Sequence, residues 1–194
     1  MLHTPQGRTV LAPNAASLRL SEGWPAGAAE QAEIMVEIEV AACAFTLELN
    51  VSGLVCFVLE YTPPTIGVAH TAVVSAMCGD GDDRCGSPGN PPTNETLALT
   101  MRDDVISLRL FTDQWLSEAY WQGGRVATTV PSQFGALTSA TEMSISATTA
   151  TAAGFVGEEA AAATSTCEVA LRSVRAWRVG GIWVSPEDVL KPPE

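Results

Sequence analysis

The feature that most constrains the fold is a regular alternation of apolar and polar side chains in many short segments. It is clearest where Ile34, Val36 and Ile38 alternate with Glu37 and Glu39. A period of two places successive side chains on opposite faces of an extended strand, with one face buried and the other solvated. Similar patterns or short apolar runs recur in residues 45–49, 54–61, 65–77, 96–100, 105–112, 116–121, 125–130, 143–149, 167–175 and 177–184.

Turn-forming residues separate these segments and indicate how the strands connect. Asn50 begins one turn, Pro63 and Pro64 end a strand because proline cannot donate to a ladder, and residues 122–124 supply a glycine-rich hairpin turn. Many short strands at intervals of roughly ten residues predict an all-β protein. We expect a two-sheet antiparallel β-sandwich of the jelly-roll, concanavalin-like kind.

The expected domain organisation is one module with irregular ends. Residues 1–30 carry scattered proline, glycine and alanine and are expected to form a linker or irregular lead-in. Residues 31–185 form the sandwich module, and residues 186–194 form a C-terminal tail. A chain of 194 residues with 46% hydrophobic and 16% charged residues is globular in composition, and it is long enough to bury a sizeable core.

The charge of the chain argues against several classes of partner. The formal net charge is −12, so the surface repels nucleic-acid phosphates and anionic lipids. No segment approaches the roughly 20 apolar residues of a membrane-spanning helix. We therefore expect neither nucleic-acid nor membrane partners, whereas neutral sugars are indifferent to the charge.

The cysteines and glycosylation sequons bear on localisation, which the chain leaves unknown. There are five cysteines, at positions 43, 56, 78, 85 and 167. Glycines and aspartates between Cys78 and Cys85 favour a loop closed by a disulfide, with free thiols as the alternative. Asn50 and Asn94 begin glycosylation sequons. The N-terminus lacks an apolar signal region, so we expect either a protein that is not secreted or a signal that lies upstream.

No metal site or cofactor is expected. Three aspartates gather in one loop, at Asp80, Asp82 and Asp83. Arg84 interrupts the spacing that an EF-hand calcium loop needs, so a solvated acidic loop is the favoured interpretation. The two histidines, His3 and His70, are far apart in sequence. Neither lies in a nucleophile motif.

Residues 106–131 carry the most specific pattern in the chain. An alternating strand ends in an aspartate, a glutamate follows five residues later, and an aromatic pair precedes a Gly-Gly-Arg turn into another strand. The pattern resembles the C-terminal β-sandwich domain of glycoside hydrolase family 32, the β-fructofuranosidase or invertase-like enzymes. The matching positions are Asp113, Glu118, Tyr120, Gly123, Gly124 and Arg125. A weaker resemblance covers residues 15–185.

The resemblance implies that the catalytic carboxylates belong to a five-bladed propeller that precedes the sandwich. Such enzymes hydrolyse or transfer β-fructofuranosyl units of sucrose or fructans with retention, and the intact protein would be extracellular or vacuolar. The propeller motifs are absent from this chain. We therefore expect a non-catalytic module that stabilises the propeller, its partner in the intact enzyme. A free-standing lectin-like carbohydrate-binding module is the alternative, and homo-oligomerisation is a further expectation.

Two sets of candidate residues lie around the predicted hairpin, and no catalytic residue is assigned. The first set is a cluster that shapes the turn, made of Asp113, Glu118, Gly123, Gly124 and Arg125. The second set would contact sugar and consists of Trp115, Trp121 and Arg125. Tryptophan more often packs in a core or between domains, so packing is the alternative role for the tryptophans.

Overall fold

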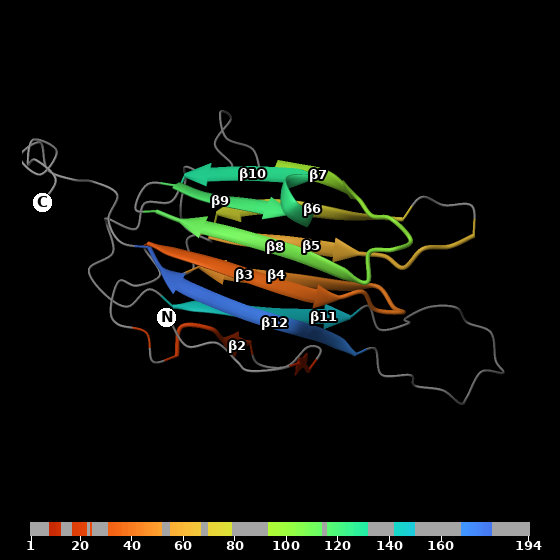
Figure 1. Ribbon diagram of the computed structural model, residues 1–194, viewed down its shortest axis with the longest axis horizontal. Helices are drawn as coiled ribbons and strands as arrows, with labels where there is room; N and C mark the ends of the chain where they lie inside the picture. Colours follow the sequence, from red (N-terminus) through yellow and green to blue (C-terminus); the bar gives the residue numbers. More distant parts are fainter. Residues whose placement is uncertain are drawn as a thin grey trace, which may run out of the picture.

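The computed structural model describes residues 8–12, 17–22, 24, 31–51, 55–66, 70–78, 93–113, 116–131, 142–149 and 168–179. These residues form two antiparallel sheets of six strands each. The sheets lie face to face as a sandwich (Figure 1). The predicted two-sheet antiparallel β-sandwich is therefore confirmed. Within the described residues, no helix is long and apolar enough to cross a membrane.

The sheet nearest the viewer in Figure 1 is called the front sheet. Its strands in order are β1 (Thr9–Leu11), β12 (Val169–Arg178), β3 (Ala32–Glu39), β8 (Val105–Thr112), β9 (Leu116–Trp121) and β10 (Val126–Pro131). The β9–β10 hairpin contains a short 3-10 turn, η2 (Gln122–Gly124). Strand β3 lies in the middle of this sheet, between β12 and β8, although these three strands are far apart in the chain.

The opposite sheet is called the back sheet. Its strands in order are β2 (Leu18–Arg19), β11 (Met143–Thr149), β4 (Phe45–Val51), β5 (Val55–Tyr61), β6 (Thr71–Cys78) and β7 (Thr93–Ala98). Residues 1–30, expected to be an irregular lead-in, supply β1 to the front sheet and β2 to the back sheet. Each of these short strands adds to one sheet, so part of the lead-in is paired.

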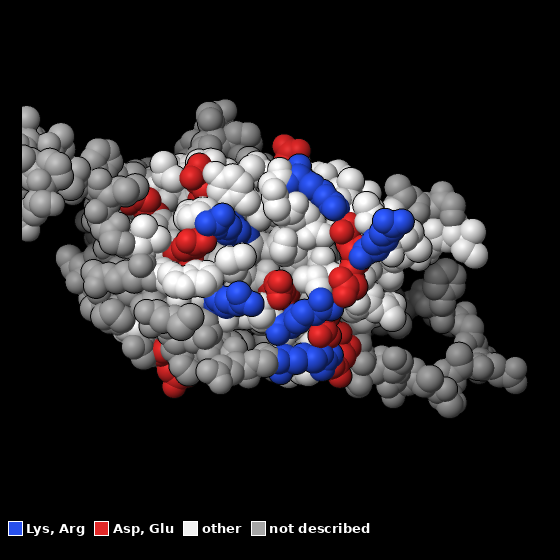
Figure 2. Space-filling model, in the orientation of Figure 1, with Lys and Arg blue, Asp and Glu red and all other residues white. Residues whose placement is uncertain are grey.

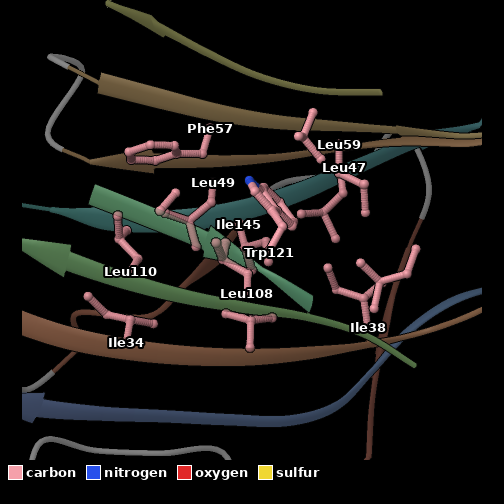
Figure 3. Close-up of a cluster of buried hydrophobic side chains, with 14 of the residues drawn as sticks. Ile34, Ile38, Leu47, Leu49, Phe57, Leu59, Leu108, Leu110, Trp121 and Ile145 are labelled. Carbon is pink, nitrogen blue, oxygen red and sulfur yellow. The ribbon is translucent and has the colours of Figure 1, made fainter. Parts of the chain in front are cut away.

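The core lies between the sheets and follows from the alternation. The inward side chains of β3, from Ala32 to Ile38, are all 0% exposed. They face an equally apolar layer from β4 and β5. Figure 3 shows the indole of Trp121 between the sheets, among leucine and isoleucine side chains. Burying one large aliphatic side chain contributes about 1.5–3 kcal/mol, so the core is the main source of stability.

Several strands differ from their predicted bounds; β7, for example, spans Thr93–Ala98 and not residues 96–100. The segment expected at residues 65–77 forms β6, which starts only at Thr71. The gap expected between the segments at 167–175 and 177–184 is not found, because β12 continues through Trp177 to Arg178. Residue 167 and residues 180–184 lie outside the described residues. Its register against β3 shifts between Leu171 and Ser173. This irregularity lets one long strand keep its apolar face inward on both sides of the shift.

Candidate functional site

The β9–β10 turn is held by one side chain. Gln122 has φ 47°, and Gly123 and Gly124 have φ 65° and 93°. This confirms that the turn needs glycine. The Gln122 amide oxygen accepts hydrogen bonds from the backbone N–H and hydroxyl of Ser107 at 2.8 and 3.0 Å. Its Nε2 donates to the Val105 carbonyl at 2.9 Å. The turn is thereby tied to the start of β8.

Arg125 binds a different carboxylate from those expected. Its Nη1 lies 2.8 Å from Asp103 Oδ2 and donates to the Ala98 carbonyl at 3.2 Å. The Arg125 guanidinium, and to a smaller extent the backbone N–H of Thr100, lower the pKa of Asp103 to about 2. Glu118 pairs with Thr129, three residues along the ladder from the turn end of the hairpin. The expected cluster of Arg125 with Asp113 and Glu118 is therefore not assembled.

The tryptophan expected to stack on sugar is in the core instead. Trp121 is 0% exposed, and its indole Nε1 has no hydrogen-bond partner among the described residues. A ligand at the surface has no access to this ring, so Trp121 is a packing residue, the alternative weighed for it. Trp115 lies outside the described residues, and Arg125 is held by Asp103. These three residues therefore form no common binding surface in the described structure.

The outer face of the front sheet carries alternating charges, as Figure 2 shows. We call this surface the front face. Its ion pairs join Arg109 to Glu33 at 2.8 Å, Arg8 to Glu39 at 2.8 Å and to Glu168, and Arg172 to Asp104 at 2.9 Å. The Ser173 hydroxyl also donates to Glu37 at 2.7 Å. These arginines are about half exposed, so each pair contributes little stability.

A small pocket opens at one end of the front face. It has a volume of about 310 Å³. Its walls are Gln31, Phe111, Thr112, Asp113, Leu116, Glu118 and Val179. The ends of β3, β8, β9 and β12 contribute these residues, which are up to 148 positions apart in the chain (179 − 31). We call this the end pocket.

The backbone around the end pocket is held by hydrogen bonds. The Asp113 N–H donates to the Leu116 carbonyl at 2.8 Å, which closes the β8–β9 connection. The Val179 N–H donates to the Gln31 carbonyl at 3.0 Å. The Thr112 hydroxyl accepts from the Ala32 N–H at 3.0 Å and donates to its carbonyl at 3.3 Å. The pocket walls are therefore anchored to the sheet.

The end pocket unites two predicted residues with several that the sequence reasoning missed. Asp113 and Glu118 belong to the predicted turn cluster, and both line the pocket. Phe111, Gln31 and Val179 were not singled out. One signal for Phe111 was available, because an aromatic residue at an outward position of an alternating strand is exposed to ligands. No local signal marked Gln31 or Val179.

The described structure defines the state of two cysteines, Cys56 and Cys43. Cys56 on β5 is a free thiol, and burial, with a smaller effect from Glu48, raises its pKa to about 11. It is therefore protonated and unreactive at neutral pH. Cys43 is disulfide-bonded. The expected pairing of Cys78 with Cys85 lies outside the described residues, since only the backbone of Cys78 is described.

The two glycosylation sequons lie on the same side of the sandwich. Asn50 is on β4 and Asn94 is on β7, both in the back sheet. Val51, next to Asn50, and Leu97, three residues after Asn94, are buried, and the alternation puts both asparagines on the opposite face of their strands. The asparagine side chains therefore belong to the outer face of the back sheet, away from the front face and the end pocket.

The fold and site define a two-sheet antiparallel β-sandwich with a charged sheet face that ends in a small pocket. No model of a known protein family and no curated protein matches the chain. Fructan 1-exohydrolase IIa from Cichorium intybus has a similar structure, with TM-score 0.56, 14% identity, and coverage of 90% of this chain and 34% of that one. A fructofuranosidase from Schwanniomyces occidentalis gives TM-score 0.52, 12% identity, and coverage of 91% and 33%.

These similarities establish a shared fold. At such low sequence identity they do not show what activity this chain has. This chain spans about a third of the length of either enzyme.

Proposed function

We propose that this chain is the non-catalytic C-terminal sandwich module of a family 32 type glycoside hydrolase that acts on sucrose or fructans. The observation that carries the proposal is a coincidence of two independent signals. The sequence pattern of residues 106–131 resembles the sandwich of that family, and nine tenths of the chain shares its fold with a third of a fructan exohydrolase. In this role the module packs against an N-terminal propeller and stabilises it.

The proposal places the catalytic carboxylates outside this chain, and turnover assays test it. Retaining hydrolysis needs two carboxyl groups about 5 Å apart that flank the bond. Asp113 and Glu118 both line the end pocket, so they are the pair to test. Purified protein incubated with sucrose and with inulin should release no fructose. Turnover that disappears in Asp113→Asn would overturn the proposal.

The partner in this role is a propeller domain encoded before the module. The reading frame upstream of Met1 should carry propeller motifs, namely an Asn-Asp-Pro-Asn-Gly-like strand, an Arg-Asp-Pro-like triplet and a Glu-Cys-like dipeptide. When that propeller and this chain are co-expressed as separate pieces, they should purify together. A frame that lacks the motifs, or pieces that fail to associate, would contradict the stabilising role.

A second role is favoured by one specific observation, the end pocket. A free-standing lectin-like module requires accessible binding groups, whereas Trp121 is buried and Arg125 is paired with Asp103. The end pocket is open and has both an aromatic ring and polar groups in its walls. Calorimetric titration with fructans and other neutral glycans tests this role, and the absence of heat across the panel would remove it.

We also propose that the protein passes through the secretory pathway. The observation behind this is that both sequons lie on one solvated sheet face, where a glycan would not disturb the core. The disulfide of Cys43 fits an oxidising compartment. An extracellular or vacuolar location follows from this proposal.

A further inference from the structure

We propose that the end pocket binds a single neutral sugar residue, with its apolar face on the ring of Phe111 and its hydroxyl groups on Glu118 and Gln31. This inference rests on the second role proposed above and names the site for it. It does not depend on whether the chain also supports a propeller.

Phe111 is an aromatic wall of the end pocket, and two neighbouring side chains hold its ring in place. The guanidinium carbon of Arg109 lies 4.6 Å from the ring centroid. Tyr120 meets the ring edge to face, with centroids 6.0 Å apart at 85°. Arg109 precedes Phe111 by two residues on the same strand, whereas the pocket lies beyond it, toward Asp113 and Leu116. Arg109 thus covers one face of the ring, and Phe111 also lines the end pocket.

The polar groups of the pocket suit hydroxyl groups. Glu118 lies directly opposite Phe111 in the β8–β9 pairing. Within the described part of the chain, its carboxylate has no hydrogen bond or ion pair, so it can accept from two hydroxyls. The Gln31 amide can both donate and accept. Thr112 is excluded from this set, because its hydroxyl already donates to and accepts from Ala32.

The charges around the pocket disfavour anionic ligands. Asp113 and Glu118 repel an anion. The Arg109 guanidinium already lies over the Phe111 ring and weakens the attraction of that ring for a second cation. A neutral polyhydroxylated ligand is not repelled by the carboxylates and can donate its hydroxyl groups to them. The volume of about 310 Å³ lies at the small end of ligand pockets, which suits one sugar ring better than a chain.

The test is a titration of the full chain, labelled with ¹⁵N, with D-fructose, D-glucose, D-galactose and sucrose, followed by NMR and calorimetry. We expect at least one sugar to shift the side-chain amide signal of Gln31. Phe111→Leu should weaken binding of that sugar roughly two- to tenfold through the loss of aromatic contact. Glu118→Gln should weaken it less, since the amide still accepts a hydrogen bond. Glu48→Gln, on the back sheet, is the matched control and should leave binding unchanged.

Three outcomes would overturn the inference, and each has a different meaning. If no sugar binds, the result contradicts both the assignment of the end pocket as a sugar site and the lectin-like role. If a sugar binds equally well to wild type, Phe111→Leu and Glu118→Gln, carbohydrate binding stands but the end pocket is not its site. If choline displaces the sugar and Glu118→Gln abolishes choline binding, the pocket is a cation site. The Gln31 signal in the unmutated protein keeps the test informative even if Phe111→Leu fails to fold.

Discussion

The guanidinium of Arg125 holds the carboxylate of Asp103 through two contacts, Nη1 to Oδ2 at 2.8 Å and Nη2 to Oδ1 at 3.4 Å. The same Nη1 donates to the carbonyl of Ala98, the last residue of β7. Because β7 belongs to the back sheet and Arg125 follows the turn of a front-sheet hairpin, this arginine joins the two layers at one end of the sandwich.

Replacing Arg125 with glutamine should therefore lower the thermal stability. Both Asp103 contacts and the bond to Ala98 would be lost. We expect the Tm to fall by only a few degrees, because the pair lies at the surface and is partly screened by solvent. Arg102→Gln is the matched control, because it removes an exposed arginine from the adjacent turn. Equal Tm values for the two variants in thermal denaturation followed by circular dichroism would contradict the bridging role of Arg125.

The same contact predicts a loss of stability in acid. The pKa of Asp103 is lowered from 3.8 to about 2, first by Arg125 and then by Thr100. Because the pKa is lower in the folded than in the unfolded protein, its contribution is present above the unfolded value. It is lost as the pH falls from about 4 toward 2. The Tm of wild type should drop through this window, and Asp103→Asn should flatten the drop in part, since Arg172 also lowers the pKa of Asp104. Identical pH profiles for wild type and Asp103→Asn would refute this.

Trp121 should be required for stability and dispensable for ligand contact. Its ring fills the space between the sheets at 0% exposure. Trp121→Ala should cost about 3–5 kcal/mol through lost burial and the cavity left behind. Trp121→Phe should cost much less, because phenylalanine refills part of the space and removes an indole N–H that has no partner. Urea denaturation measures both, and a small effect of Trp121→Ala would show that the ring is not in the core.

The disulfide partner of Cys43 should be Cys167. Strand β12 runs antiparallel to β3, with Leu171 opposite Ile38. Arg8 binds both Glu39 and Glu168, so the chain just before β12 lies beside the end of β3. A bond that closes so long a loop contributes about 4–5 kcal/mol in the chain-entropy account. Peptide mapping without reduction should recover Cys43 linked to Cys167. Recovery of Cys43 linked to Cys85 would contradict the register argument, and Cys56→Ser is the control for a thiol that forms no bond.

Glycans should attach to the back sheet and leave the end pocket open. Asn94 is exposed on β7, whereas Asn50 on β4 is only half exposed. Expression in a eukaryotic secretory host should therefore modify Asn94 more completely. A mass decrease after endoglycosidase treatment, absent in Asn94→Gln, is the measurement. Modification confined to Asn50 would contradict this order of accessibility.

Much of the strand content was readable from the sequence because alternation is a local property. The period of two in residues 105–112, 116–121 and 143–149 predicted β8, β9 and β11 with their observed bounds. The hairpin glycines were readable for the same reason, since positive φ is a requirement of the turn itself. Residues 65–70 and the gap expected before Trp177 were misjudged, because the end of a strand depends on where its neighbour ends.

The amino-acid sequence by itself determined most of the strands after residue 30, which side of each faces inward and where the tightest turn lies. These properties arise from neighbouring residues and their backbone preferences. Only the tertiary structure decided that Arg125 binds Asp103 and not the carboxylates at the far end of its hairpin. It also decided that Trp121 is buried and that Gln31, Phe111, Glu118 and Val179 share one pocket. The physical reason is that strand order and register bring together residues that are far apart in the chain. Local sequence patterns do not predict such contacts.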